Sequence, residues 1–496
     1  MTFRLCSRRV RHELRYTRTA WLLDEPGAGE VQRLLSTGTC RPSVLDRAEI
    51  ADVVTRRGST DARPANTPQL SGGTDASALG TTLVTMSGSH LSNVWFSVTP
   101  LQVASGHGSW VTTVDGEEYL DFAAGIAVNS TGHAHPAVAK AIGDQAQRFI
   151  HAQVNVYQHD LLEPLAAKLA DITPTGIDTF FFANSGAEIT EGAIKLAKQA
   201  TKRPHTIVFS GSFHGRTHLA MAMTTSKTGY RAGHAPLPSG VFVAPYPDPL
   251  ASDQDAEVAA ALSGFDHVLK ALTAPDETAA VILEPVLGEG GYIPAPPAFI
   301  HGIVERCRQH GILFIADEVQ SGFGRTGKWF AVDHYDIEPD VICMAKGIAS
   351  GFPFAALGTS RALDDKWPTG SHGGTYGGNA MGCAAALATI DIMSEPGFLP
   401  NVIARGEQLQ AGIRELQREH DVIAQVRGLG LMIGTEFHSA ARVAAVQQHC
   451  LHEGRMILMN AGTYGTTLRW MPPLVVTDGE IDLALAAFSA ALKATA

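Results

Sequence analysis

The sequence has no apolar run that approaches the roughly 18 uninterrupted residues of a bilayer-spanning helix. Cysteine is also scarce: six residues are scattered through 496, with no CxxC pair and none of the close spacing of a disulfide scaffold. This pattern is typical of reduced thiols, so we expect a cytoplasmic protein without a membrane partner. The length and the hydrophobic content of 45% are sufficient for a large core and more than one domain.

An excess of positive charge is lacking as well. The formal net charge is -11 and the sequence pI is near 6.0. Because clustered Lys and Arg bind nucleic acids and anionic membranes, this balance argues against both partners, although local arginines could still bind small anions. No GxGxxG motif follows a strand, since "GLGLMIG" (Gly428 to Gly434) has another spacing and leads into a strand. A dinucleotide-binding dehydrogenase is therefore disfavoured.

Residues 1–85 lack both lysine and a clear apolar period; the first lysine of the chain is Lys140. The segment is rich in arginine and contains a tract of Ser, Thr, Gly, Pro and Asp, which predicts disorder or loose structure. Acids such as Glu13 and Asp24 come too early for a transit peptide. A start codon assigned too far upstream, with Met86 near the true beginning, is an equal alternative.

From about Leu101 onward, apolar runs alternate with amphipathic segments. Strands are expected in "TFFFA", "HTIVF", "AAVIL", "ILFIADEV" and "DVICM", and helices in "AEITEGAIKLAKQAT" and "PAFIHGIVERCRQHG". This alternation predicts an α/β fold with a mainly parallel sheet that binds ligands at the carboxyl ends of its strands. We expect a large domain at 151–394, a smaller α+β domain at 395–496, and in 86–150 the N-terminal part of the small domain with its linker.

The segment "NSGAE" lies between an expected strand and an expected helix. The backbone N–H groups of Gly186 and Ala187 would be unpaired at the helix N-terminus, where the macrodipole favours an anion such as phosphate. A simple helix cap in a tight turn is the alternative.

Two charged residues directly follow apolar runs: Asp317 in "FIADEV" and Lys346 in "CMAKG". Taken alone, each is also explained as a polar residue at a strand end. Together with a phosphate-binding turn they are what pyridoxal phosphate requires. An acid keeps the ring nitrogen protonated, and a lysine with a lowered pKa forms a Schiff base with the aldehyde.

Longer stretches make the interpretation specific. The chain from about Leu101 resembles the class III aminotransferases of fold type I, which include 4-aminobutyrate, ornithine and acetylornithine aminotransferases. The resemblance rests on "NSGAEITEGAIKLAK", "SFHGRTH", "EPVLGEGG", "FIADEVQSGFGRTGKWFA", "MAKGIASGFP" and "GGTYGGN", in that order. It implies pyridoxal 5'-phosphate as cofactor, and a homodimer or a dimer of such dimers.

The resemblance also implies the roles of the cofactor-site residues. Lys346 would be the Schiff-base lysine, and Asp317 would pair with the pyridine nitrogen. The other expected contacts are Phe213 and Val319 on the two ring faces, Gln320 near the ring hydroxyl, Ser185, Gly186 and Ala187 at the phosphate, and Thr375 at the phosphate of the neighbouring subunit.

Three charged residues would select the substrates by the same resemblance. Arg216 would bind the carboxylate distal to the reacting amine, and Arg469 the α-carboxylate of glutamate or 2-oxoglutarate. Glu289 would pair with Arg469 when the donor has no α-carboxylate.

Four further features bear on the donor. Ile126 occupies a position where ornithine aminotransferases have tyrosine, which counts against ornithine, and "LMNAGTYGTTLR" is more similar to the 4-aminobutyrate group. Leu287 and Asn155 depart from the usual pattern at positions expected to line or border the substrate pocket.

We therefore predict ping-pong transamination through Lys346 between an ω-amino acid like 4-aminobutyrate and 2-oxoglutarate, giving a semialdehyde and glutamate. The alternatives are an acetylornithine or ornithine-type aminotransferase and a non-catalytic binding protein of the same fold. The histidine pairs in "TGHAHP" and "FHGRTH" lack accompanying acidic or cysteine ligands, so no metal is predicted.

Overall fold

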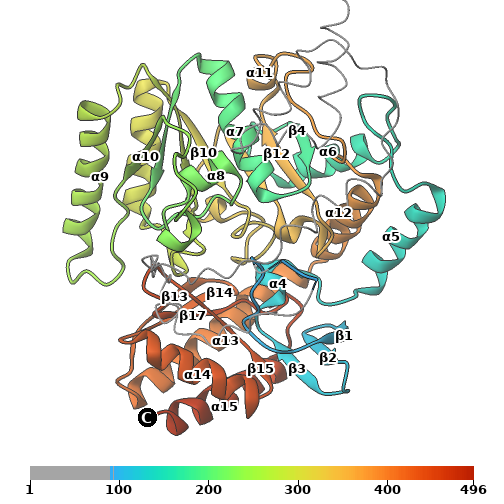
Figure 1. The fold of residues 1–496 in the computed structure, drawn as a ribbon, viewed down its shortest axis with the longest axis vertical. Coiled ribbons are helices and arrows are strands. Elements are labelled where there is room, and N and C mark those ends of the chain that lie inside the picture. The colour runs from blue at the N-terminus through green and yellow to red at the C-terminus, as the bar shows by residue number, and fades with distance from the viewer. Residues whose placement is uncertain (1–89, 93) are drawn as a thin grey trace, which may run out of the picture. The chain divides into compact units, whose positions relative to one another are not determined.

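The computed structural model describes residues 90–92 and 94–496, and the predictions for residues 1–85 lie outside this range (Figure 1). The largest sheet among the described residues has seven strands. These are β4 (Thr179–Ala183), β5 (His205–Phe209), β6 (Val241–Ala244), β7 (Thr278–Leu283), β10 (Leu313–Asp317), β11 (Val341–Met344) and β12 (Ala355–Thr359), in the order β4-β12-β11-β10-β7-β5-β6.

Most neighbours in this sheet are parallel. β6, β5, β7, β10 and β11 form a continuous parallel series, and β12 is antiparallel to both β11 and β4. The predicted α/β fold with a mainly parallel sheet is confirmed. The carboxyl ends of five strands therefore meet at one edge, where side chains from distant parts of the sequence can form a site.

Helices cover both faces of the sheet, so its central strands are apolar without alternation. All six residues of β7, "TAAVIL", are buried. Within that strand Val281 packs in the same cluster as Phe265 and Phe299 of α9 (Gln254–Ala271) and α10 (Pro297–His310). Ile282, one residue later, packs in the cluster of α7 (Gly186–Thr201) on the opposite face.

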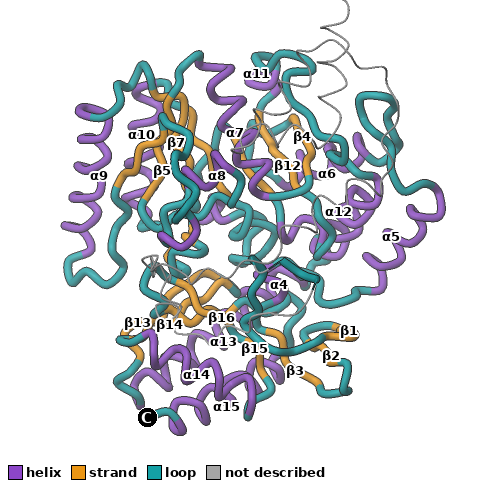
Figure 2. Tube along the Cα trace, viewed as in Figure 1, coloured by secondary structure: helices purple, strands orange, loops and turns teal. Residues whose placement is uncertain are grey.

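The remaining elements between β3 and α13 connect the sheet and its helices (Figure 2). They are α4 (Ala124–Ala127), α5 (Pro136–Arg148), α6 (Leu162–Ile172), α8 (His218–Met223), η3 (Thr228–Tyr230), β8 (Val286–Leu287), β9 (Ile293–Pro294), η4 (Ala331–His334), η5 (Lys346–Ala349), α11 (Arg361–Asp364) and α12 (Ala380–Met393).

The C-terminal residues form a second, antiparallel sheet. Its strands are β13 (Ile423–Leu429), β14 (Met432–Phe437), β17 (Thr467–Trp470) and β16 (Met459–Ala461), in that spatial order. The helices of this region are α13 (Phe398–Glu419), α14 (Ala440–His452) and α15 (Asp478–Ala494). Since β17 carries Arg469 between two buried neighbours, the sheet holds this arginine on a rigid element.

An N-terminal meander joins the C-terminal region. β1 (Val103–His107), β2 (Trp110–Thr113) and β3 (Glu118–Asp121) are antiparallel, and β3 pairs in parallel with β15 (Met456–Ile457). The blue strands and red helices of Figure 1 lie together accordingly. The domain boundaries at 150 and 395 stay predictions. Among the described residues, no helix combines the length and apolarity needed to cross a bilayer.

Candidate functional site

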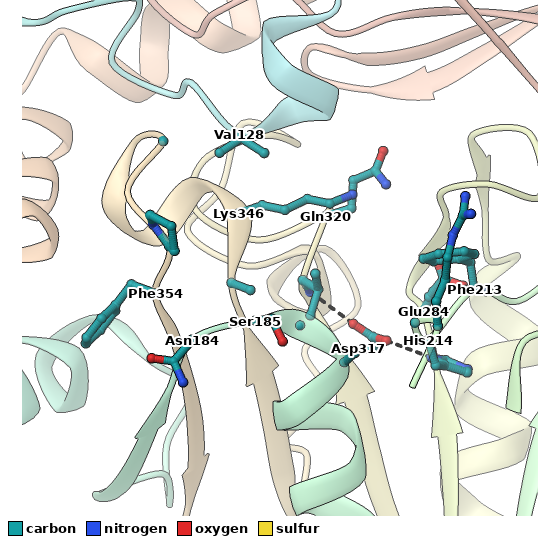
Figure 3. Close-up of a pocket in the computed structure, with 18 of the residues that line it drawn as sticks. Val128, Asn184, Ser185, Phe213, His214, Glu284, Asp317, Gln320, Lys346 and Phe354 are labelled. Atoms are coloured by element: carbon teal, nitrogen blue, oxygen red, sulfur yellow. Dashed lines mark hydrogen bonds and ion pairs between the residues drawn. The ribbon is translucent and has the colours of Figure 1, made fainter. Parts of the chain in front are cut away.

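A cavity of about 360 Å³ lies at the carboxyl ends of the large sheet (Figure 3). Nine of the residues expected at the cofactor or substrate line it: Ser185, Gly186, Ala187, Phe213, Arg216, Asp317, Val319, Gln320 and Lys346. Other lining residues include Val128, Asn184, His214, Glu284 and Phe354. The cavity therefore brings together segments that are up to 226 residues apart, from Val128 to Phe354.

Lys346 is the first residue of η5, two residues beyond the end of β11. Its φ of +45° is uncommon for a residue with a side chain, and such strain is concentrated at functional sites. Burial lowers the pKa of the Lys346 amine to about 8, although Glu289 opposes this shift; Arg469 reinforces it. Figure 3 shows the side chain extending across the cavity toward Gln320. A larger fraction of this amine is neutral near pH 8 than for an ordinary lysine, as a nucleophile requires.

Asp317 ends β10 and is 3% exposed. Its Oδ1 accepts a hydrogen bond from Val319 N at 3.1 Å, and its Oδ2 lies 2.7 Å from His214 Nδ1. Burial lowers the pKa of His214, but the hydrogen bond and charge of Asp317, with the charge of Glu284, outweigh it and raise the pKa overall. The carboxylate is thus fixed in direction by two contacts.

Glu284 follows the last residue of β7 and is a site residue that our sequence analysis missed. Its Oε1 accepts from Phe213 N at 2.7 Å and its Oε2 from Gly288 N at 2.8 Å. Burial raises the pKa of Glu284 to about 7; His214 opposes this shift and Asp317 adds to it. An acid directly after a buried strand was the signal that identified Asp317, and it would have identified Glu284 as well.

The N-terminus of α7 closes one end of the cavity. Ser185 is the N-cap, and its hydroxyl accepts a hydrogen bond from Glu188 N at 3.3 Å. A Cβ on Gly186 would lie 2.9 Å from Val319 Cγ1, so only glycine allows this approach of helix and strand end. The Ser185 cap is therefore present, and the anion site stays a prediction for the same turn.

The cavity fits pyridoxal phosphate. The N-terminus of α7 would hold the phosphate, and the buried carboxylate of Asp317 would pair with the ring nitrogen. Phe213 and Val319 supply apolar surface for the ring faces, and Lys346 supplies the amine. One cavity thus contains a helix N-terminus, a buried carboxylate, apolar surface and an amine, and the contact expected of Thr375 would come from a neighbouring subunit.

A second group of charges lies beside the cavity. Arg469 Nη1 donates a hydrogen bond to Glu289 Oε1 at 2.5 Å, and we call this pair the gate. Burial alone would raise the pKa of Glu289, but the charge and hydrogen bond of Arg469 outweigh it and lower the pKa to about 2. Arg216 differs, since it is exposed and no carboxylate of the described residues forms an ion pair with it. One arginine is therefore neutralised internally and the other is available to a ligand.

Two further residues near the gate were missed from the sequence. Tyr230 donates a hydrogen bond from its hydroxyl to Glu289 Oε2 at 3.1 Å. Burial lowers the pKa of Lys227, with Glu289 opposing and Arg469 reinforcing the shift. Both lie in or beside the short η3 segment after α8, where no strand end or glycine-rich turn marks them.

Besides Glu289 and Arg469, four other residues expected at or near the site do not line the cavity. Ile126 is 38% exposed and has a φ of +67°. Thr375 and Asn155 are exposed, and Leu287 is buried. The expected contact of Thr375 is with a neighbouring subunit, so it stays a prediction.

Comparison with known proteins supports the same cofactor as the geometry of the cavity does. Residues 91–492 match the family described as aminotransferase class-III. The chain is 39% identical over 395 residues to 5-aminovalerate aminotransferase DavT of Pseudomonas putida (78% of this chain, 92% of the relative). It is 40% identical over 386 residues to an acetylornithine aminotransferase of Methanothermobacter thermautotrophicus (78% and 92%) and 37% identical over 382 residues to 4-aminobutyrate aminotransferase GabT of Escherichia coli (75% and 88%).

Solved structures of transaminases have the same fold. An amine transaminase from an uncultivated Pseudomonas species, in its PLP-bound form, matches with a TM-score of 0.75 and 27% identity over 83% of this chain and 98% of that chain. The ornithine aminotransferase of Toxoplasma gondii matches with a TM-score of 0.72 and 28% identity over 80% and 91%.

Proposed function

The chain is a class-III aminotransferase of the pyridoxal phosphate-dependent fold, and from this premise we propose that it transfers the amino group of an ω-amino acid like 4-aminobutyrate to 2-oxoglutarate. The products would be a semialdehyde and glutamate, formed in two half-reactions. The observation that carries this proposal is the gate beside the unpaired Arg216. One arginine is open to a carboxylate in every substrate, and the other is open only when Glu289 moves away.

The charges fit the two half-reactions in turn. A donor with one distal carboxylate would bind Arg216 and leave the gate closed. Glutamate and 2-oxoglutarate have a second carboxylate, which would replace Glu289 on Arg469. Because a buried arginine without a partner is unfavourable by several kcal/mol, Arg469 needs one carboxylate or the other in each complex.

The residues of the cavity have separate roles in the proposed reaction. Bound pyridoxal phosphate supplies an aldehyde that exchanges amines and a ring that accepts the electron pair from the substrate carbon. Asp317 would pair with the ring nitrogen, and Phe213 and Val319 would contact the two faces of the ring. Lys346 Nζ accepts the proton from the substrate carbon as a general base and returns it as a general acid. Thr375 would complete the phosphate site of the neighbouring protomer in a homodimer.

An acetylornithine aminotransferase is the second candidate. The relatives support it as well as the first, since the acetylornithine enzyme of Methanothermobacter thermautotrophicus is 40% identical. The gate would act in the same way, because the α-amine of acetylornithine is acetylated, the terminal amine reacts, and the single carboxylate is distal to it. That substrate would place its distal carboxylate on Arg216 and leave the gate closed, and only glutamate or 2-oxoglutarate would open it.

Single-turnover spectra of the bound cofactor test the assignment. The holoenzyme is mixed separately with 4-aminobutyrate, 5-aminovalerate, acetylornithine, ornithine and glutamate, and the loss of the cofactor's long-wavelength band is followed. We expect fast conversion by glutamate and by an ω-amino acid, and much slower conversion by acetylornithine and ornithine. Fast conversion by acetylornithine with none by the ω-amino acids would replace the first candidate by the second.

The location is proposed as cytoplasmic. The four described cysteines, Cys307, Cys343, Cys383 and Cys450, are free and buried. Unpaired thiols of this kind are usual in a reducing compartment.

A further inference from the structure

Tyr230 contacts both carboxylate-binding positions of the site. Its hydroxyl donates to Glu289 Oε2, while Arg469 binds Oε1 of the same carboxylate. The Arg216 guanidinium lies over the Tyr230 ring, 4.5 Å from its centre. The ring also meets Phe213 edge to face at 5.2 Å. One side chain thus links the gate, the open arginine and the expected cofactor ring.

The backbone around Glu289 is held on three sides. Gly288 N donates to Glu284, and Glu289 O accepts from Gly462 N at 3.0 Å. Gly291 O accepts from Arg427 Nη2 at 2.8 Å. Since these contacts fix the loop, the gate can open by rotation of the Glu289 side chain alone. Its closed position then depends on the two groups that bind the carboxylate, Arg469 and Tyr230.

We propose that Tyr230 is a positioning residue that sets the preference between substrates with one carboxylate and substrates with two. Its hydroxyl stabilises the closed gate, and its ring supports the guanidinium of Arg216 in the orientation that binds the distal carboxylate. The inference rests on the proposed function, because it assigns a cause to the selectivity of the same site.

The hydroxyl remains a donor throughout the working pH range. Burial raises the pKa of Tyr230 well above its ordinary value, and the charge of Glu289 raises it further. Hydrogen bonds to a charged group are stronger than those between neutral groups. Removal of the hydroxyl should therefore weaken the closed gate without changing the net charge of the site.

Equilibrium binding of two inhibitors isolates this effect from catalysis. Butyrate has one carboxylate and can bind Arg216 with the gate closed, whereas glutarate has two and must displace Glu289. In the Tyr230→Phe holoenzyme, titration calorimetry should show a glutarate Kd about tenfold lower than in the unchanged enzyme, as loss of one charge-assisted hydrogen bond implies. The butyrate Kd should change by less than about twofold, because the ring remains beneath Arg216.

Two variants serve as controls. Glu289→Gln removes the charge of the gate and should lower the glutarate Kd in the same direction. Tyr246→Phe removes another tyrosine hydroxyl, which donates to Ile293 O at 3.2 Å away from the gate, and should leave both constants unchanged. In the Glu289→Gln background, Tyr230→Phe should have little further effect, since the two groups act through one contact.

The ring is tested by Tyr230→Leu. Loss of the aromatic face should raise the butyrate Kd about threefold or more relative to Tyr230→Phe, as expected for a lost cation–π contact. Equal butyrate affinities in the Leu and Phe variants would show that the ring does not support Arg216.

The outcomes separate this inference from the proposed function. If Glu289→Gln lowers the glutarate Kd but Tyr230→Phe does not, the gate operates and the role of Tyr230 is wrong. If Arg469→Ala leaves glutarate binding unchanged, the dual-carboxylate site itself is wrong. A tenfold effect of Tyr230→Phe that persists undiminished in the Glu289→Gln background would overturn the inference, because Tyr230 would then act independently of Glu289.

Discussion

Glu289 and Arg469 are 180 residues apart in the sequence and form a hydrogen-bonded ion pair of 2.5 Å in the interior. They are 9% and 3% exposed, respectively. Two buried charges at this distance satisfy each other only while both are present, and removal of one partner leaves the other in a medium of low polarity. A pair of this kind beside a substrate cavity is suited to exchange with a substrate carboxylate.

Replacement of Glu289 by the neutral isostere should separate the two half-reactions. In Glu289→Gln, a donor such as 4-aminobutyrate leaves Arg469 without a negative partner, so its half-reaction should slow by about tenfold or more. Glutamate brings its own carboxylate to Arg469, and its half-reaction should change by less than about threefold. Stopped-flow measurement of the cofactor band with each substrate gives both rates.

The converse variant should have the converse effect. Arg469→Ala removes the binding group for the second carboxylate, so glutamate and 2-oxoglutarate should react at least ~100-fold more slowly. The ω-amino acid should be affected much less, although Glu289 then lacks its cation. Equal slowing of both half-reactions in both variants would assign Glu289 and Arg469 to the scaffold.

Lys346→Ala tests the assignment of the amine. The variant should still bind pyridoxal phosphate, because the N-terminus of α7 and Asp317 are unchanged, and it should lose essentially all turnover. Cofactor retention after gel filtration and steady-state assays measure the two properties. Lys366→Ala, at an exposed position in the loop after α11, is the matched control and should keep full activity. Near-normal turnover of Lys346→Ala would contradict the mechanism.

The sequence was most informative where strands of the large sheet end. Buried strands without alternation predicted the parallel sheet, and the rule that ligands bind at strand ends predicted that Asp317 and Lys346 would meet. The structure places both in one cavity with the N-terminus of α7. Local chain signals and sheet geometry were sufficient for this part of the site.

The contacts around the gate could not be predicted from strand ends and sheet geometry. Tyr230 lies in the short 3₁₀ segment η3. Its hydrogen bond to Glu289 depends on how the loop after α8 packs against the loop that carries Glu289. Such contacts between irregular segments have no period or fixed spacing in the sequence. The contact of Arg427 with Gly291 O depends likewise on the packing of β13 against the loop that carries Glu289.

Removal of residues 1–85 should have little effect on the folded protein. This segment lacks the apolar period of a core-forming element. The truncated chain should melt within about 2 °C of the full chain and keep its specific activity, as expected when little buried surface is lost. A large decrease in melting temperature would show that the segment contributes to the folded core.

The pH dependence of the Lys346 amine gives a test of the electrostatics. Its pKa is lowered to about 8, mainly by burial, and only the neutral amine is nucleophilic. The rate of acetic anhydride labelling at Lys346 of the apoenzyme, followed by mass spectrometry, should therefore rise with pH through a midpoint near pH 8 and level off at higher pH. The exposed Lys366 provides an internal reference in the same digest.

The charge of Glu289 raises the pKa of Lys346, and the charge of Arg469 lowers it. Glu289→Gln should consequently move the midpoint to lower pH, and Arg469→Ala should move it to higher pH. Shifts in the same direction in both variants would mean that the two gate charges do not act on Lys346 as the geometry requires.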